Sequence, residues 1–141
     1  MTTITITENQ SIATIFDNSL IHELLNLAEQ KSVAIDMIAQ LPAASAEIAF
    51  ALTFADSDLT KLLAITGKHN KLITTGHTKI AIKSEAMIDG VGFAAKVFDI
   101  LNKLGCSPLL ITTGLDEISL LVHAGCGREL EERLKAAFDV H

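Results

Sequence analysis

The chain has 141 residues, a length that suits one compact domain or two very small ones. Apolar residues make up 49% of the sequence, yet no uninterrupted apolar run approaches the roughly 20 residues that a membrane span needs. The net charge is −6, basic residues occur singly, and the aromatic residues are six phenylalanines. This composition argues against membrane insertion. It also argues against nucleic-acid binding, which relies on a basic surface and often on aromatic rings that stack on bases.

The N-terminal segment alternates Thr and Ile and lacks the basic region and apolar core of a signal peptide. We therefore expect a soluble, cytoplasmic protein. The two cysteines, Cys106 and Cys126, have no zinc-binding or redox-motif spacing, and we expect two free thiols in a reducing compartment.

The first third of the chain predicts two strands and a helix. Residues 4–7 and 11–16 have strand character, and the polar residues 8–10 predict a turn between them. Residues 17–19 are Asp, Asn and Ser, the types that cap the starts of helices. Apolar residues at helical spacing then predict a helix over 20–31.

A second strand is predicted over 33–41, with Asp36 as its lone charge. A loop over 41–46 contains one of the two prolines and leads into a strand over 47–54. A short helix over 59–66 follows, and then a strand over 71–76.

The second half starts with a strand over 78–84 and a glycine-containing turn over 87–92. A helix over 93–105 follows, with Gly105 at a position typical of helix C-termini. Further predicted elements are strands over 107–114 and 117–124 and an amphipathic helix over 128–138.

The helix and strand at 20–40 recur at 93–113 with a constant offset of 73 positions. Leu20, Leu24, Leu25, Met37 and Ile38 align with Phe93, Val97, Phe98, Leu110 and Ile111. Repeats of this kind indicate duplicated units. Each copy has the order β-α-β-β-α, and a further strand would complete a ferredoxin-like β-α-β-β-α-β unit with an antiparallel sheet. Exposed edge strands of such sheets favour dimerisation.

Catalytic and metal-binding patterns are weak. The five histidines show no metal-binding spacing, although His69 and His77 flank one strand. Asp36 is either an electrostatic contact for an amine or an outward-facing position on a half-exposed strand. Gly90-Val91-Gly92 before a helix either presents amides to an anion or forms a tight turn. We expect no enzymatic activity, no metal and no cofactor.

Two segments resemble the ACT domains of aspartokinases. The stretch 80–122 resembles the second ACT domain, with its pattern G-V-A-A-(K/R)-x-F-x-x-L, then I-N-I-x-x-I-S-T-S, then I-S-x-x-V. The matching residues are Gly92, Ala94, Ala95, Lys96, Phe98, Leu101, Ile111, Thr112, Thr113, Ile118, Ser119 and Val122. Residues 33–40 resemble the I-N-V-D-M-I-x-Q signature of the first ACT domain through Asp36, Met37, Ile38 and Gln40.

The resemblance implies an α+β fold of two ferredoxin-like ACT domains packed side by side, the first inserted into the second. ACT domain 1 would span 11–76, and ACT domain 2 would combine 1–10 with 77–141. It also implies a homodimer that binds lysine or threonine between ACT domains. Because the pair accounts for the whole chain, we expect a separate regulatory subunit or a free-standing relative of the kinase.

The turns that would contact a ligand depart from the family pattern. The D-x-P-G turn of the first ACT domain reads Phe16-Asp17-Asn18-Ser19 here, so its Pro and Gly are lost and Asp17 is shifted by one residue. The asparagine before the V-D-M-I core is Ala34, and its counterpart in the second copy is Ser107. Pro108 follows and removes an amide donor.

Three interpretations remain open: binding of lysine or threonine, binding of another small molecule, and a ligand-free module that dimerises or docks on an aspartokinase or other enzyme. A small enzyme on the same fold is a weaker fourth. The predicted ligand-binding residues are Asp17, Asn18, Ser19, Ile35, Gln40, Ser107, Thr112 and Thr113.

Overall fold

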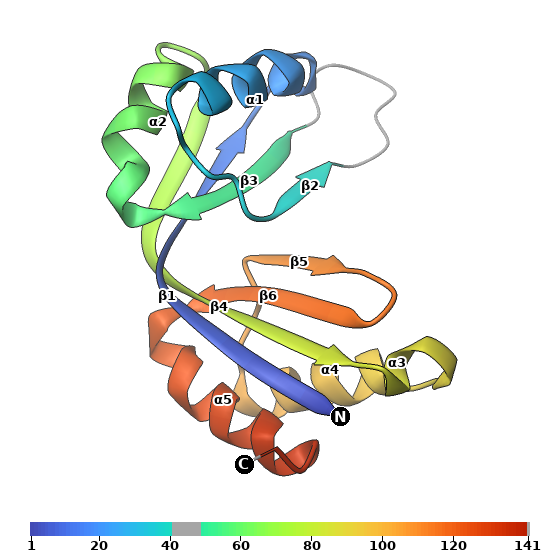
Figure 1. Cartoon of the computed structure of the whole chain (residues 1–141). Helices are drawn as coiled ribbons and strands as arrows, with labels where there is room; N and C mark the ends of the chain where they lie inside the picture. The colour runs from blue at the N-terminus through green and yellow to red at the C-terminus, as the bar shows by residue number, and fades with distance from the viewer. Residues whose placement is uncertain (41–48, 141) are drawn as a thin grey trace. The chain divides into compact units, whose positions relative to one another are not determined.

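Two long strands organise the chain in the computed structural model, which describes residues 1–40 and 49–140 (Figure 1). They are β1, Thr2–Ile15, and β4, Lys71–Ser84. Both run through two compact units. We call Asn9–Gly76 the continuous unit, and Met1–Glu8 with His77–His141 the split unit.

The continuous unit contains two helices and three strands beside the first residues of β4. The helices are α1, Ile21–Gln30, and α2, Leu59–Thr66, and the strands are β2, Ile38–Gln40, β3, Phe50–Ala55, and the second half of β1. β3 pairs antiparallel with both β1 and β2. Alternate residues of a strand share one face, and Ala13, Ile15, Phe50, Leu52 and Phe54 accordingly pack together. Leu24 of α1 and Leu62 of α2 join them, so both helices cover the same face.

The split unit repeats this plan. β4 pairs antiparallel with β6, Glu117–His123, and β6 pairs antiparallel with β5, Leu110–Thr113. The helices are α3, Ala86–Asp89, α4, Phe93–Leu104, and α5, Ala124–Ala137. Its apolar cluster includes Ile80, Leu101, Leu120 and Leu134, with Ile4 and Ile6 of β1 packed against it. The strand order through the described residues is β2-β3-β1-β4-β6-β5.

The strands predicted over 4–7 and 11–16 are one strand, so the turn predicted at 8–10 is wrong. Asn9 has φ +57° inside β1, and Gly76 has φ +74° inside β4. Asparagine and glycine tolerate this left-handed conformation, which distorts a strand locally without ending it. The predicted strands over 71–76 and 78–84 are likewise joined in β4.

β2 is shorter than the predicted strand over 33–41, whose last residue lies outside the described range. Asp36 N–H donates to Thr53 O at 3.0 Å, while Thr53 N–H donates to Met37 O at 2.9 Å. Two residues thus oppose one, as in a β-bulge. Met37 N–H donates to the Thr53 hydroxyl at 2.8 Å, which satisfies the buried amide at the bulge. The loop predicted over 41–46 and the first residues of the strand predicted over 47–54 also lie outside the described residues.

The 73-residue offset recurs in the hydrogen bonds. Val33 N–H donates to Ala28 O at 2.8 Å after α1, and Cys106 N–H donates to Leu101 O at 2.9 Å after α4. The donors Asp36 N–H and Leu109 N–H are also 73 residues apart, but their acceptors, Thr53 O and Leu121 O, are 68 residues apart. The copies therefore share helix endings and the entry into their edge strands.

Candidate functional site

A polar cluster lies at the start of α1 in the continuous unit. Asp17 has extended backbone (φ −151°, ψ 101°) and caps the short 3-10 turn η1, Asn18–Leu20, which leads into α1. Its Oδ1 accepts from the Ser19 hydroxyl at 2.6 Å and from the Ser19 amide at 3.0 Å. These two hydrogen bonds lower the pKa of the Asp17 carboxyl, the one from the hydroxyl having the larger effect, because both favour the ionised form. Asp17 is therefore a carboxylate at neutral pH.

Gln40, at the end of β2, reaches this cluster. Its Nε2 donates to Asn18 Oδ1 at 2.6 Å, across 22 residues of sequence. Four of the predicted ligand-binding residues, Asp17, Asn18, Ser19 and Gln40, therefore gather at one place. Ile35 behaves differently, because its partly buried side chain packs against the apolar cluster.

The equivalent place in the split unit is a glycine turn between α3 and α4. Gly92 has φ +84° and precedes α4, and no side chain caps this helix. Gly90 N–H donates to Ala86 O at 3.0 Å, and a Cβ on Gly90 would lie 2.4 Å from that oxygen. Only glycine allows so close an approach of the backbone. The short helix α3 and this turn replace the longer turn predicted over 87–92.

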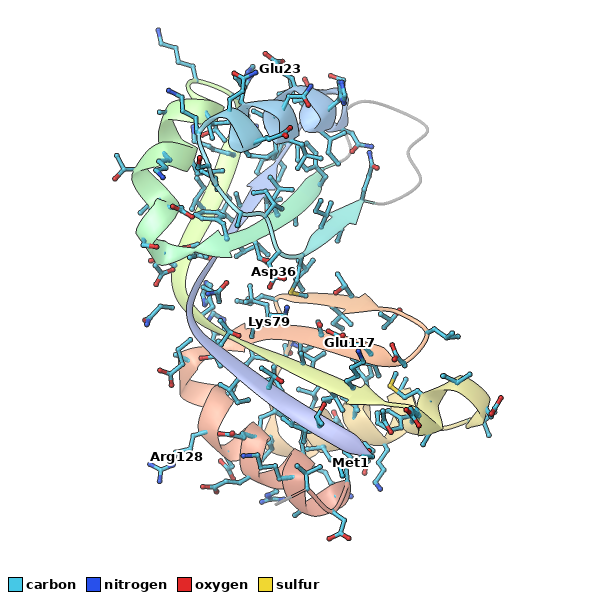
Figure 2. The ribbon with its side chains drawn as sticks, in the orientation of Figure 1. Met1, Glu23, Asp36, Lys79, Glu117 and Arg128 are labelled. Carbon is cyan, nitrogen blue, oxygen red and sulfur yellow. The ribbon has the colours of Figure 1, made fainter. Side chains whose placement is uncertain are left out.

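Two cavities flank the glycine turn. One, of about 290 Å³, is lined by Gly90, Gly92, Phe93 and Thr113 among others. The other, of about 350 Å³, is lined by Gly92, Lys96 and Phe138 among others. Of the residues predicted for this half, Thr113 lines the first cavity, whereas Ser107 and Thr112 are outside both linings. Thr112 is half-buried opposite Ser119, whose hydroxyl donates to Glu117, labelled at the start of β6 in Figure 2, at 3.0 Å.

Lys96 and Phe138 were not among the predicted site residues. Lys96 Nζ donates to Ala137 O at 2.7 Å and lies 4.5 Å from the centre of the Phe138 ring. A cation is favourable at the C-terminal end of α5 and over an aromatic face. Phe138 also stacks on Phe93, with ring centres 4.4 Å apart. The sequence marked Lys96 as part of the family pattern. It marked Phe138 only as an apolar residue at helical spacing in the last predicted helix.

The remaining candidate chemistry concerns metal ligands, the two thiols and Asp36. In residues 1–40 and 49–140, no group of three His, Cys, Asp or Glu side chains is arranged to hold a metal ion. Burial, with a contact to Cys126, raises the pKa of the Cys106 thiol to about 12, and both cysteines are free thiols. Asp36 is exposed on the segment that leads into β2 (Figure 2). No helix in the described part of the chain is long and apolar enough to cross a membrane.

No protein-family model matches the sequence, and no curated protein is significantly similar to it. Solved structures match its fold. The ligand-free regulatory subunit of aspartate kinase from Thermus thermophilus superposes with a TM-score of 0.84 and 16% identity, over 96% of each chain. The regulatory subunit from Thermus flavus gives 0.83 and 14%, also over 96% of each chain.

The aspartate kinase from Synechocystis gives a TM-score of 0.86 and 18% identity, over 97% of this chain and 26% of that one. These findings confirm, at the level of fold, the resemblance seen in the sequence. The chain has the fold of the regulatory subunits of aspartate kinase, and this fold also forms part of the longer aspartate kinase chain from Synechocystis.

Proposed function

We propose that the chain is a non-catalytic regulatory module of two ACT domains, which forms a homodimer and binds an amino acid such as lysine or threonine. The continuous unit would be the first ACT domain, inserted into the second, which is the split unit. Each would be a ferredoxin-like β-α-β-β-α-β domain. The observation that carries this proposal is the likeness to regulatory subunits of aspartate kinase over 96% of both chains.

The polar cluster at the start of α1 supports ligand binding in the first domain. Asn18 and Gln40 offer amide donors and acceptors beside the Asp17 carboxylate. Both hydrogen bonds from Ser19 use Asp17 Oδ1, so a ligand ammonium can approach Oδ2. The ligand carboxylate would bind near the N-terminal end of α1, where the helix dipole favours negative charge. Ile35 would contribute backbone groups.

In the second domain, the proposed contacts are Ser107, Thr112 and Thr113. Thr113 borders a cavity of about 290 Å³, at the lower end of the range of about 300–1,000 Å³ for small-molecule sites. Thr112 and Thr113 share β5, and Ser107 precedes it. Because no side chain caps the start of α4 as Asp17 caps the turn before α1, we expect this site to prefer a different ligand or none.

A thermal-shift screen of the twenty amino acids tests the proposal. A ligand at 100 times its dissociation constant adds about 2.7 kcal/mol to the free energy of unfolding, so one amino acid should raise the melting temperature by several degrees. Asn18→Ala and Gln40→Ala should each raise the dissociation constant of that amino acid at least tenfold. Thr60→Ala, on the exposed surface of α2, is the matched control. The absence of a shift with every amino acid would contradict ligand binding.

The partner proposals need separate measurements. Analytical ultracentrifugation should give twice the chain mass of 15.1 kDa if the homodimer forms. The matching structures are named as regulatory subunits of aspartate kinase, and we propose an aspartokinase as a docking partner. Co-purification with the kinase and no amino-acid response would favour the alternative, a ligand-free interaction module.

A further inference from the structure

One carboxylate connects the two long strands at the end of the continuous unit. Asp56 follows β3 and begins the 3-10 turn η2, Asp56–Asp58, which leads into α2. Its Oδ1 accepts from the Ser11 hydroxyl of β1 at 2.5 Å. The amide of Gly76 in β4 donates to Oδ1 at 3.2 Å and to Oδ2 at 3.1 Å. Donors from two strands thus converge on one side chain.

The hydrogen bond between Ser11 and Asp56 is costly to lose. Ser11 is fully buried, so its hydroxyl requires a partner inside the protein. Hydrogen bonds to a carboxylate are shorter and stronger than those between neutral groups. Asp56 is half-buried, and its hydrogen bonds with the Gly76 amide lie at the exposed surface. The contact therefore holds η2 against β1 and β4.

The backbone of β4 is unusual at this contact. Gly76 has φ +74°, and a Cβ added there would meet no atom within 4 Å. The glycine is therefore required by the backbone conformation alone, and not by a close neighbour. A strand residue in the left-handed region interrupts the regular ladder, which leaves its amide directed at the Asp56 carboxylate.

β1 has a similar interruption. Asn9 has φ +57°, and it is the first residue of the continuous unit, just as Gly76 is the last. Each long strand therefore changes its backbone conformation where it enters or leaves that unit. Glycine and asparagine are the residues for which a switch between left-handed and extended backbone requires least energy.

We propose that Asn9 and Gly76 are hinge points of the two long strands, and that Asp56 is the latch that fixes the hinge in β4. While Gly76 N–H is held by Asp56, β4 keeps its left-handed residue. When Asp56 moves away, Gly76 is free to become extended. The latch requires no ligand, so this proposal does not depend on the proposed function.

Amide hydrogen exchange resolved by NMR tests the latch. In Asp56→Ala, the Gly76 amide should exchange at least tenfold faster, whereas amides of core strands such as Leu52 and Leu120 should change less than threefold. This pattern identifies local opening, because global unfolding exposes all of these amides together. Asp58→Asn, in the same turn and paired with Lys61 at 3.9 Å, is the matched control and should leave Gly76 unchanged.

Asp56→Asn serves as the second variant if Asp56→Ala does not fold. Its single oxygen can still accept from Ser11 and Gly76, but the NH2 that replaces Oδ2 cannot accept from Gly76. Gly76 exchange should therefore rise by a smaller factor, still well above that of Leu52. The latch is refuted if Gly76 exchange is unchanged in the variant that folds. It is refuted equally if Gly76, Leu52 and Leu120 accelerate by the same factor, because the carboxylate would then contribute only to overall stability.

Discussion

At the scale of single residues, the two copies end their first helices in the same way with different amino acids. Ser32 after α1 has φ +58° and Gly105 after α4 has φ +65°. Their amides donate to Glu29 O and Asn102 O, each at 3.1 Å. This is the Schellman pattern, in which glycine avoids the steric penalty that an L side chain has in the left-handed region.

The comparison predicts opposite effects for reciprocal substitutions. Ser32→Gly should raise the free energy of unfolding by about 0.5–1 kcal/mol, because it removes the strain at φ +58°. Gly105→Ser should lower it by about 1 kcal/mol for the same reason. Urea unfolding followed by circular dichroism measures both. Equal signs for the two substitutions would show that neighbouring packing, and not backbone strain, decides the effect.

The lowered pKa of Asp17 predicts a dependence of stability on pH. A carboxyl whose pKa is lower in the folded state stabilises the fold above its unfolded pKa, about 3.9, and this contribution is lost as pH falls through the folded value. Asp17→Asn keeps a helix-capping side chain but does not titrate. Between pH 5 and about 2, its melting temperature should therefore fall less steeply than that of the native protein. Thr60→Ala, which removes no carboxyl from the exposed surface of α2, should show the native slope.

At the scale of elements, the helices were predictable because apolar spacing and capping residues, which are local in sequence, determine where a helix forms. The helices over 20–31, 59–66, 93–105 and 128–138 follow from apolar spacing and capping residues, and the structure contains α1, α2, α4 and α5 there, with α5 beginning earlier, at Ala124. The continuity of β1 was not predictable in this way. Residues 8–10 are polar and turn-like, yet Gln10 pairs with Ala55 of β3, and the left-handed Asn9 distorts the strand without ending it.

The candidate site shows the same limit. Asp17, Asn18 and Ser19 were predicted as a helix cap from residue type, and Asp17 does cap the turn before α1. The contact between Asn18 and Gln40 joins residues far apart in sequence, and only the family pattern suggested Gln40. The bond between Asp56 and Gly76 had no sequence signal, because it depends on where β4 passes η2 in the folded chain.

The bulge at β2 yields a prediction about Thr53. Its hydroxyl accepts from the buried Met37 amide at 2.8 Å. Valine has the same shape as threonine but no hydroxyl, so Thr53→Val removes the partner of that amide. The expected loss is about 1–3 kcal/mol of unfolding free energy. In Thr53→Val, the Met37 amide should exchange faster than in the native protein. Thr53→Ser retains the hydroxyl, so in that variant the Met37 amide should exchange at the native rate. If Val and Ser variants have the same Met37 exchange rate, the hydroxyl does not hold the bulge.

At the scale of the whole molecule, the two apolar clusters are separate but their strands are shared. Leu24 belongs to one cluster and Leu101 to the other, and each is 2% exposed. β1 and β4 contribute to both units. Each unit therefore contains one part of β1 and one part of β4, and the other parts of these strands belong to the other unit.

This sharing predicts cooperative unfolding. Leu24→Ala and Leu101→Ala should each lower the free energy of unfolding by about 2–5 kcal/mol. Each should also shift one common transition for both units, and not a transition of the mutated unit alone. Because the chain has no Trp, residue-resolved NMR signals from both clusters are the appropriate probe. Two transitions with different midpoints would show that the units unfold independently.

The division of β1 between the units also has a consequence for synthesis. A ribosome releases the continuous unit, Asn9–Gly76, before it makes most of the split unit. The apolar side chains of Ile4 and Ile6 therefore stay exposed to solvent until residues as late as Leu134 have left the exit tunnel. During that interval, an alternating Thr and Ile segment of high strand propensity is exposed in the nascent chain, where chaperones would bind it.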